Sequence, residues 1–222
     1  MPFPGGIEGT SNATLILSVA ATIIYALIVD MRPMPLRTAV KALATALLAV
    51  LTFVENGPAL LFGALVLSAG GDALLSRDGD RMFVGGLTSF LAAHLFYIAL
   101  FYLQGGGLEV VLAETWRMAV AVLIAAVALV MLVLLWRCVK PALRLPIVVY
   151  EIAIACMGLA ALTMHNAWVI CGALMFIASD VMLASERFVV SAISPHRAWM
   201  RLAVWVLYYL AQVTIALSFL LR

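Results

Sequence analysis

Charged residues are scarce in this chain of 222 residues: Asp, Glu, Lys and Arg make up 11% of it, whereas hydrophobic residues make up 66%. Soluble domains contain about 25% charged residues, so this composition excludes an ordinary soluble fold. Apolar stretches of about 18 residues or more recur along the whole chain, and each is long enough to cross a hydrocarbon layer about 30 Å thick. The composition therefore predicts an all-α integral membrane protein.

Cysteine, histidine and N-terminal basic residues are also few. Cys138, Cys156 and Cys171 have neither the spacing of a disulfide framework nor that of metal ligands, so free thiols are expected. A membrane zinc hydrolase needs several His or Cys side chains on converging helices, and His94 is the one histidine expected inside a membrane helix. No Lys or Arg precedes Arg32, so the first hydrophobic segment lacks the basic region of a secretory signal and is expected to be retained.

Hydropathy and the positions of Gly and Pro predict a single transmembrane domain over residues 1–222, with eight helices and no second domain. The expected helices cover residues 13–29, 36–54, 58–75, 82–103, 115–138, 145–162, 167–184 and 199–221. Lys and Arg gather in the connections after the first, third, fifth and seventh helices. Both termini are therefore expected on the non-cytoplasmic side, and in a bacterium the chain is expected in the inner membrane.

A short internal repeat accompanies two acidic residues. Gly63-Ala64-Leu65 precedes Asp72, and Gly172-Ala173-Leu174 precedes Asp180 at a similar distance. Two parallel four-helix repeats related by an axis along the membrane normal would produce such a pattern. Small residues are also common wherever membrane helices pack closely, so the pattern leaves both explanations open.

Ionisable side chains inside membrane helices are candidates for function, because an Asp or Lys at mid-helix costs roughly 2.5 to 3.5 kcal/mol on insertion scales. Asp72 and Asp180 are expected at matching depths near the cytoplasmic ends of their helices. Ser68 lies one turn before Asp72, where it could hydrogen-bond its carboxyl group. Other polar residues are expected to line the same cavity, which would open to the inner leaflet: Lys41, His94, Tyr97, Tyr150, Glu151, Tyr208, Tyr209 and Gln212.

Two neighbouring buried acids suit acid–base chemistry, because a medium of low polarity and mutual repulsion can keep one protonated beside one ionised at neutral pH. Structural roles compete with this interpretation. Asp72 and Asp180 could instead pair with Arg77 and Arg187, and the Lys41 side chain could reach the lipid headgroups.

Two further features of the expected helices have alternative interpretations. Phe83, Phe90 and Tyr97 recur at helical spacing on the helix 82–103, where they would either pack against another helix or line a groove for an acyl chain. Glu151 could pair with Lys41, in which case neither side chain needs to contact a substrate. The sequence leaves Glu151 without an assigned role.

At these residues the chain resembles the YhhN-like lysoplasmalogenase family over nearly its whole length. The segments that carry the resemblance, together with the lone polar positions Lys41 and Tyr150, are Leu67–Leu75, Phe83–Phe90, His94–Tyr97, Gly172–Asp180 and Tyr208–Gln212. Two features depart from the family pattern. Ala42 follows Lys41 where proline is expected, and Glu151 is not recognised as a family feature.

The resemblance implies hydrolysis of the vinyl-ether bond at the sn-1 position of a lysoplasmalogen, which gives a fatty aldehyde and glycerophosphoethanolamine or glycerophosphocholine. It implies no metal and no organic cofactor. The expected partners are a lysophospholipid substrate and membrane lipid, and no nucleic acid is expected. The oligomeric state stays open. We expect Asp72 and Asp180 to be the catalytic acid and base, in an undetermined order. Lys41 is expected to bind the phosphate of the substrate. Five further residues are expected to position water and the glycerol oxygens: His94, Tyr97, Tyr150, Tyr208 and Gln212.

Two other functions fit part of the pattern. In a small proton- or cation-coupled transporter the carboxylates would form an ion site, but the broken midplane helices of such proteins are not expected here, since the helix interiors are largely free of proline. In an intramembrane aspartyl protease Gly70-Gly71-Asp72 would be part of a Gly-x-Gly-Asp motif. The first glycine of that motif is missing, and Ser179 stands before Asp180 where a tyrosine is needed.

Overall fold

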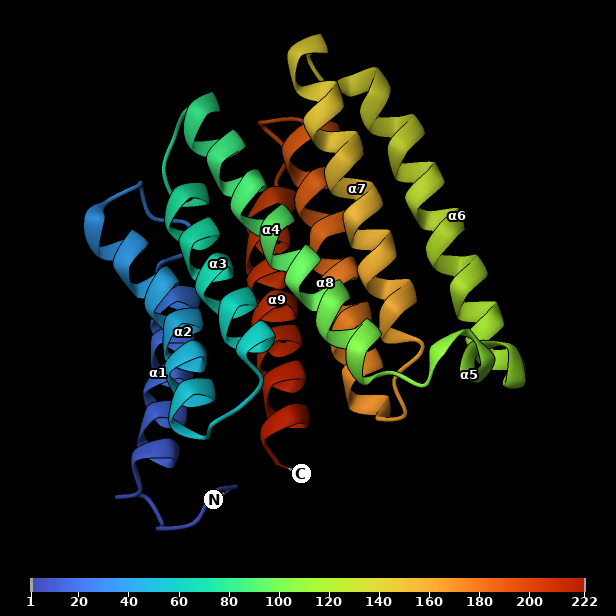
Figure 1. Ribbon diagram of the computed structural model, residues 1–222. Helices are drawn as coiled ribbons and strands as arrows, with labels where there is room; N and C mark the ends of the chain where they lie inside the picture. The colour runs from blue at the N-terminus through green and yellow to red at the C-terminus, as the bar shows by residue number, and fades with distance from the viewer. Residues whose placement is uncertain (1, 222) are drawn as a thin grey trace. The chain divides into compact units, whose positions relative to one another are not determined.

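A computed structural model describes residues 2–221, which contain nine α-helices and one short π-helix. The elements are α1 (Thr10–Ile28), α2 (Pro35–Val54), α3 (Ala59–Leu75), α4 (Asp80–Gln104), α5 (Gly107–Ala113), α6 (Thr115–Cys138), α7 (Pro141–Ala161), α8 (Ala167–Ala184), the π-helix η1 (Ser185–Val189) and α9 (His196–Leu220) (Figure 1). Each stretch that was expected to be helical is a helix.

The largest difference from the sequence expectation is at the start of α7. This helix begins at Pro141, four residues before the expected start, so Pro146 lies inside it. Proline has no N–H group to donate, and this turn therefore has one backbone hydrogen bond fewer than a regular helix. The structure also adds α5 after α4, and η1 directly after α8.

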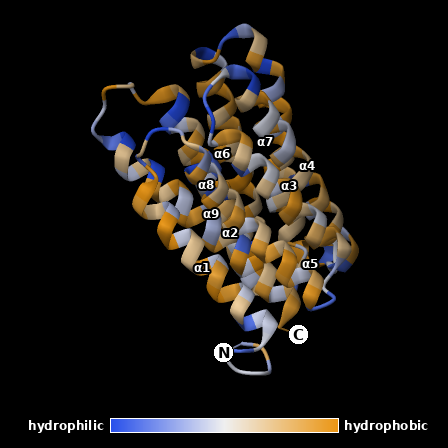
Figure 2. Ribbon diagram, turned by 90° about the vertical axis from the view of Figure 1, so that its left-hand side faces the viewer, coloured by the Kyte–Doolittle hydropathy of each residue, from blue (hydrophilic) through white to orange (hydrophobic). Residues whose placement is uncertain are grey.

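Among residues 2–221, seven helical segments are long and apolar enough to cross a membrane, and α3, with 17 residues, is slightly shorter. Large apolar side chains lie exposed along these helices: Leu27 is 80% exposed, and Phe53 and Leu145 are each 72% exposed. Figure 2 shows hydrophobic residues along the helices and hydrophilic residues mostly at the helix ends and connections. Lipid is the solvent that tolerates such surfaces, so this is a multi-pass helical membrane protein.

Residue contacts divide the chain into two compact units. Unit 1 contains residues 2–97 and 212–221, and unit 2 contains residues 98–211. The helices α4 and α9 each contribute residues to both units, because the divisions fall after Tyr97 and after Ala211.

In unit 1, hydrogen bonds and small residues hold neighbouring helices together. Ser18 of α1 donates a hydrogen bond of 2.6 Å to the carbonyl oxygen of Ala44 in α2. Glycines bring α3 and α4 close: a Cβ atom on Gly71 would lie 2.5 Å from the ring of Phe90, and one on Gly86 would lie 2.6 Å from Leu75. The absence of a side chain at Gly71 therefore sets the spacing of the two helices beside Asp72.

In unit 2, a buried arginine donates hydrogen bonds to carbonyl groups at the end of a helix. Arg117, which is 5% exposed, donates hydrogen bonds of 2.6 Å to the carbonyl oxygen of Leu162 and 2.8 Å to that of Met164, just after α7 ends. Its Nε atom lies 3.1 Å from the Glu114 carboxylate. Hydrogen bonds from Arg117 and Trp116 lower the pKa of this exposed carboxyl below its usual value. Arg117 thus provides donors for carbonyl groups that have no partner within the helix.

Arg117→Met is expected to lower the free energy of unfolding by about 1 to 3 kcal/mol, because it leaves buried carbonyl groups without a donor. Thermal unfolding of the detergent-solubilised protein measures the effect. Arg137→Met is the matched control, since Arg137 lies on the same helix with its side chain exposed. Equal decreases in the free energy of unfolding of the two variants would contradict a capping role for Arg117.

Candidate active site

In unit 1, an ion pair balances the charge of a carboxylate inside the membrane helices. Asp72 of α3 is 1% exposed, and its Oδ1 atom lies 3.2 Å from the Nζ atom of Lys41 in α2. The hydroxyl group of Thr45 donates a hydrogen bond of 2.9 Å to Oδ2. Lys41 and Thr45 are one helical turn apart and therefore share a face of α2. Both oxygen atoms of the Asp72 carboxylate thus have a partner that stabilises negative charge.

Lys41 also contacts an aromatic ring of the first helix. Its Nζ atom lies 5.9 Å from the centroid of the Tyr25 ring, within the range of a cation–π interaction. Arg37, one turn earlier on α2, lies over the same ring and donates a hydrogen bond of 3.0 Å to the carbonyl oxygen of Val29. The Lys41 ammonium group is therefore held between Tyr25 and Asp72.

Two contacts that the sequence leaves open for Asp72 are absent among the described residues. Arg77 is not its partner, since that side chain makes no ion pair within residues 2–221. Ser68 is fully buried, but its hydroxyl group has no hydrogen-bond partner among the described residues, and Thr45 donates the hydrogen bond to Asp72 instead. The partners come from α2 because that helix packs against α3.

The remaining site residues expected in unit 1 are fully buried. His94 and Tyr97 of α4 have no exposed surface, and the hydroxyl group of Tyr97 donates a hydrogen bond to Oε1 of Gln212 in α9. Phe83 and Phe90 on the same helix are also buried, at 6% and 5% exposure, and the Phe90 ring covers Gly71. Phe83, Phe90 and Tyr97 therefore serve helix packing, rather than forming an open groove.

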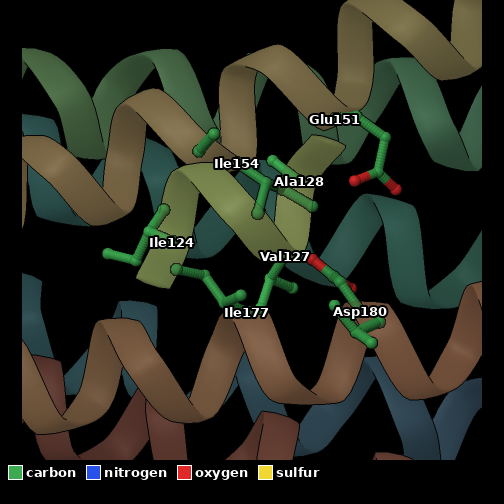
Figure 3. Close-up of a pocket in the computed structure, with 9 residues that line it drawn as sticks. Ile124, Val127, Ala128, Glu151, Ile154, Ile177 and Asp180 are labelled. Carbon is green, nitrogen blue, oxygen red and sulfur yellow. The ribbon is translucent and has the colours of Figure 1, made fainter. Parts of the chain in front are cut away.

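In unit 2, a second carboxyl group lies between α7 and α8. Asp180 of α8 is 9% exposed, and its Oδ2 atom accepts a hydrogen bond of 3.2 Å from the hydroxyl group of Tyr150 in α7. The next residue of α7, Glu151, is 8% exposed. Both carboxyl groups line a small pocket between α6, α7 and α8 (Figure 3).

The rest of the pocket wall is hydrocarbon. Its other lining residues include Ile124, Val127, Ile154, Ile177 and Val181. An apolar wall with a few convergent polar groups is the usual composition of a site for a small organic ligand. Here the polar groups are carboxyl groups, so the pocket combines a surface for a hydrocarbon chain with groups that can give or accept protons.

Tyr208 of α9 belongs to an aromatic cluster in unit 2. Its ring makes an edge contact with Phe176 of α8, with 5.5 Å between the centroids, and lies 5.8 Å from the ring of Trp205. Ser179 donates a hydrogen bond of 3.0 Å to the carbonyl oxygen of Val204, which also ties α8 to α9. Tyr208 is therefore part of the interface that holds the helix of Asp180 in place.

The residues expected from the sequence thus fall into two groups. Unit 1 contains Lys41, Asp72, His94, Tyr97 and Gln212, and unit 2 contains Tyr150, Asp180 and Tyr208. The structure pairs Lys41 with Asp72, Tyr97 with Gln212 and Tyr150 with Asp180. The expectation that the two aspartates share one cavity stays a prediction.

Thr45 and Tyr25 contact the Asp72 site but were not expected there. For Thr45, the signal was its position one turn after Lys41 on an expected helix. For Tyr25, the signal was that it is the one tyrosine in the first expected helix. Neither position indicates which residue it contacts, so the sequence does not predict these two contacts.

These features define a class: a multi-pass membrane protein with acidic side chains buried within its helices. The YhhN family model matches residues 36–219, which is most of the chain. The chain belongs to the YhhN family.

Similar proteins carry the name lysoplasmalogenase. The chain is 32% identical to human lysoplasmalogenase TMEM86A over 168 residues, which are 71% of this chain and 64% of that protein. It is 37% identical to lysoplasmalogenase TMEM86B of Sus scrofa over 165 residues, 72% of this chain and 63% of the relative. For a lysoplasmalogenase of Mycobacterium bovis the identity is 32% over 164 residues, 72% of this chain and 59% of the relative. The chain therefore covers less than two thirds of each of these relatives. No solved structure matches it.

Lys41→Met is expected to destabilise the protein by about 3 to 5 kcal/mol, because it removes the ammonium group from a buried carboxylate. The double variant Lys41→Met/Asp72→Asn is expected to recover part of this loss, since the uncompensated charge is gone. Thermal unfolding in detergent measures both, with Lys140→Met, at an exposed lysine, as the control. Wild-type stability of the single variant would show that Asp72 does not depend on this ion pair.

Proposed function

We propose that this chain is a membrane-embedded lysoplasmalogenase, which hydrolyses the sn-1 vinyl-ether bond of a lysophospholipid. The products are a fatty aldehyde and glycerophosphoethanolamine or glycerophosphocholine. Membership of the YhhN family and similarity to proteins named lysoplasmalogenase support the proposal. The observation that carries it is Asp180: a buried carboxyl group, hydrogen-bonded by Tyr150, in a pocket with hydrocarbon walls.

The chemistry of a vinyl ether explains why such a group is useful. Hydrolysis begins when an acid protonates the carbon–carbon double bond, which creates an oxocarbenium ion. Water captures this cation, and the resulting hemiacetal collapses to an aldehyde and an alcohol. A protonated carboxyl group can supply the proton and an ionised one can stabilise the cation, as the two carboxyl groups of glycosidases do.

The surroundings of the two aspartates suit different roles. Asp180 lies in an apolar pocket, where Tyr150 donates a hydrogen bond to its Oδ2 atom and its protonated form can donate a proton to carbon. Asp72 faces an ammonium group and a hydroxyl donor, which favour its ionised form. We therefore assign Asp180 as the acid and Asp72 as the anion that stabilises the cation.

The other expected residues supply donors and acceptors for the polar part of the substrate. An ammonium group has three N–H donors, so Lys41 can bind a phosphate oxygen while it remains paired with Asp72. Tyr97 and Gln212, which are hydrogen-bonded to each other, and His94 position water and the glycerol oxygens in this proposal. Tyr150 orients Asp180, and Tyr208 would contact the glycerol portion.

For the arrangement in the membrane, we propose a single transmembrane domain of eight spans, built as two parallel four-helix repeats. The eighth span is α3, whose 17 residues extend about 26 Å at 1.5 Å per residue. The glycine motifs of α3 and α8 support the repeats, and the basic connections support termini on the non-cytoplasmic side. In a bacterium this membrane would be the inner one.

The purified protein in detergent is expected to release fatty aldehyde from a lysoplasmalogen and none from the matching saturated ether lipid, because the saturated chain has no double bond to protonate. Asp180→Asn and Asp72→Asn are each expected to lower kcat at least about 100-fold, since neither amide can replace a carboxyl group. Asp78→Asn, at an exposed loop residue, is the control.

Mass spectrometry of the products provides the measurement. Monodisperse wild-type protein that leaves both lipids intact would remove the proposed activity. Aspartate variants with wild-type kcat would leave the activity but remove these residues from the mechanism.

A further inference from the structure

Glu151 is a buried acid to which the proposed mechanism gives no role. It lies in the middle of α7 with 8% of its surface exposed, and it makes no hydrogen bond and no ion pair with any of residues 2–221. A buried carboxyl group without a partner is costly. Because nothing described within the chain compensates that cost, the side chain is suited to receive a donor from a bound molecule.

The pocket of unit 2 is where such a molecule would bind. Glu151 and Asp180 come from helices that pack against each other, and Figure 3 shows both carboxyl groups at the same end of the pocket. The pocket is small and has room for about one water molecule. A water molecule needs two to four polar partners, and the oxygen atoms of the two carboxyl groups provide them.

Few titratable groups face this end of the pocket. The α6 side contributes only apolar side chains, among them Val127 and Ala128. The α7 side contributes Glu151 and, through its bond to Asp180, the hydroxyl group of Tyr150. Asp180 is the titratable group of α8 in the lining. The pocket therefore presents two carboxyl groups to whatever occupies it.

We propose that Glu151 is the base of the reaction: it binds the hydrolytic water and accepts its proton, while Asp180 is the acid and the apolar walls hold the alkenyl chain. This inference rests on the proposed lysoplasmalogenase activity. It gives the pocket one acid and one base.

The proton balance closes over one turnover. Asp180 donates its proton to the second carbon of the alkenyl chain, and the first carbon becomes the oxocarbenium centre. Water forms a C–O bond to that centre as its proton passes to Glu151, which gives a neutral hemiacetal. Glu151 then donates this proton to the glycerol oxygen as its C–O bond breaks, and the hemiacetal hydroxyl proton returns to Asp180. Both carboxyl groups end in their starting forms, and one water molecule has been consumed.

The test compares the full-length wild type with Glu151→Gln and Glu151→Asp in a continuous aldehyde assay on a lysoplasmalogen, over a range of pH. Glu151→Gln is expected to lower kcat at least about 100-fold, with KM within about threefold of the wild-type value. The base must be ionised to work, so the fall of kcat toward acid pH is expected to become shallower in this variant. Glu151→Asp, which keeps a carboxyl group, is expected to recover at least about tenfold of the lost kcat.

Two controls separate this role from a structural one. Thermal unfolding should show the glutamine variant folded as the wild type, and Glu109→Gln, at an exposed residue of α5, should have wild-type kinetics. Wild-type kcat in Glu151→Gln overturns the inference while the proposed function stands. A loss of kcat with an unchanged pH profile and no recovery in Glu151→Asp also overturns it. If the wild type releases no aldehyde, the proposed function fails and this inference fails with it.

Discussion

The structure depends on one constraint: a charged or polar side chain in a hydrocarbon layer must find its partner within the protein. Lys41 and Asp72 satisfy this requirement for each other and so join α2 to α3. Tyr150 and Asp180 do the same for α7 and α8. Loss of a partner would leave a polar group in hydrocarbon, so the polar pairs specify which helix faces meet. Apolar packing alone could not do this, because the lipid tails are as apolar as the helix surfaces.

The positions of the membrane helices could be predicted from the sequence, because apolar length and the Gly and Pro breakers are local signals. The identity of polar partners could not. Asp72 pairs with Lys41 rather than Arg77, which is closer in sequence, because the packing of α2 on α3 decides the contact. Hydropathy also missed α5, whose seven residues are too few to leave a clear periodic pattern. The sequence predicts a start for α7 that is too late, because a proline such as Pro146 usually indicates a helix boundary.

The candidate site was partly predictable for the same reason. Acids inside apolar stretches stand out against their surroundings, so Asp72 and Asp180 were found without a structure. The glycine at position 71 was visible as a small residue, but its use in bringing the Phe90 ring against α3 was not. The sequence shows Glu151 only as an acid in an apolar stretch. The structure adds that it lines the same pocket as Asp180 and has no hydrogen-bond or ion-pair partner among the described residues. The contacts of each buried acid therefore had to come from the structure.

In the proposed reaction a buried carboxyl group transfers a proton to carbon, and incorporation of a hydrogen isotope from the solvent detects that transfer. The purified protein would act on a lysoplasmalogen in D₂O, with the fatty aldehyde reduced at once to its alcohol and analysed by mass spectrometry. Unlabelled aldehyde incubated in the same buffer corrects for exchange. The account predicts one deuterium at the second carbon of the fatty product. A product without deuterium at that carbon would contradict it, because the ether would then have been cleaved without protonation of the double bond.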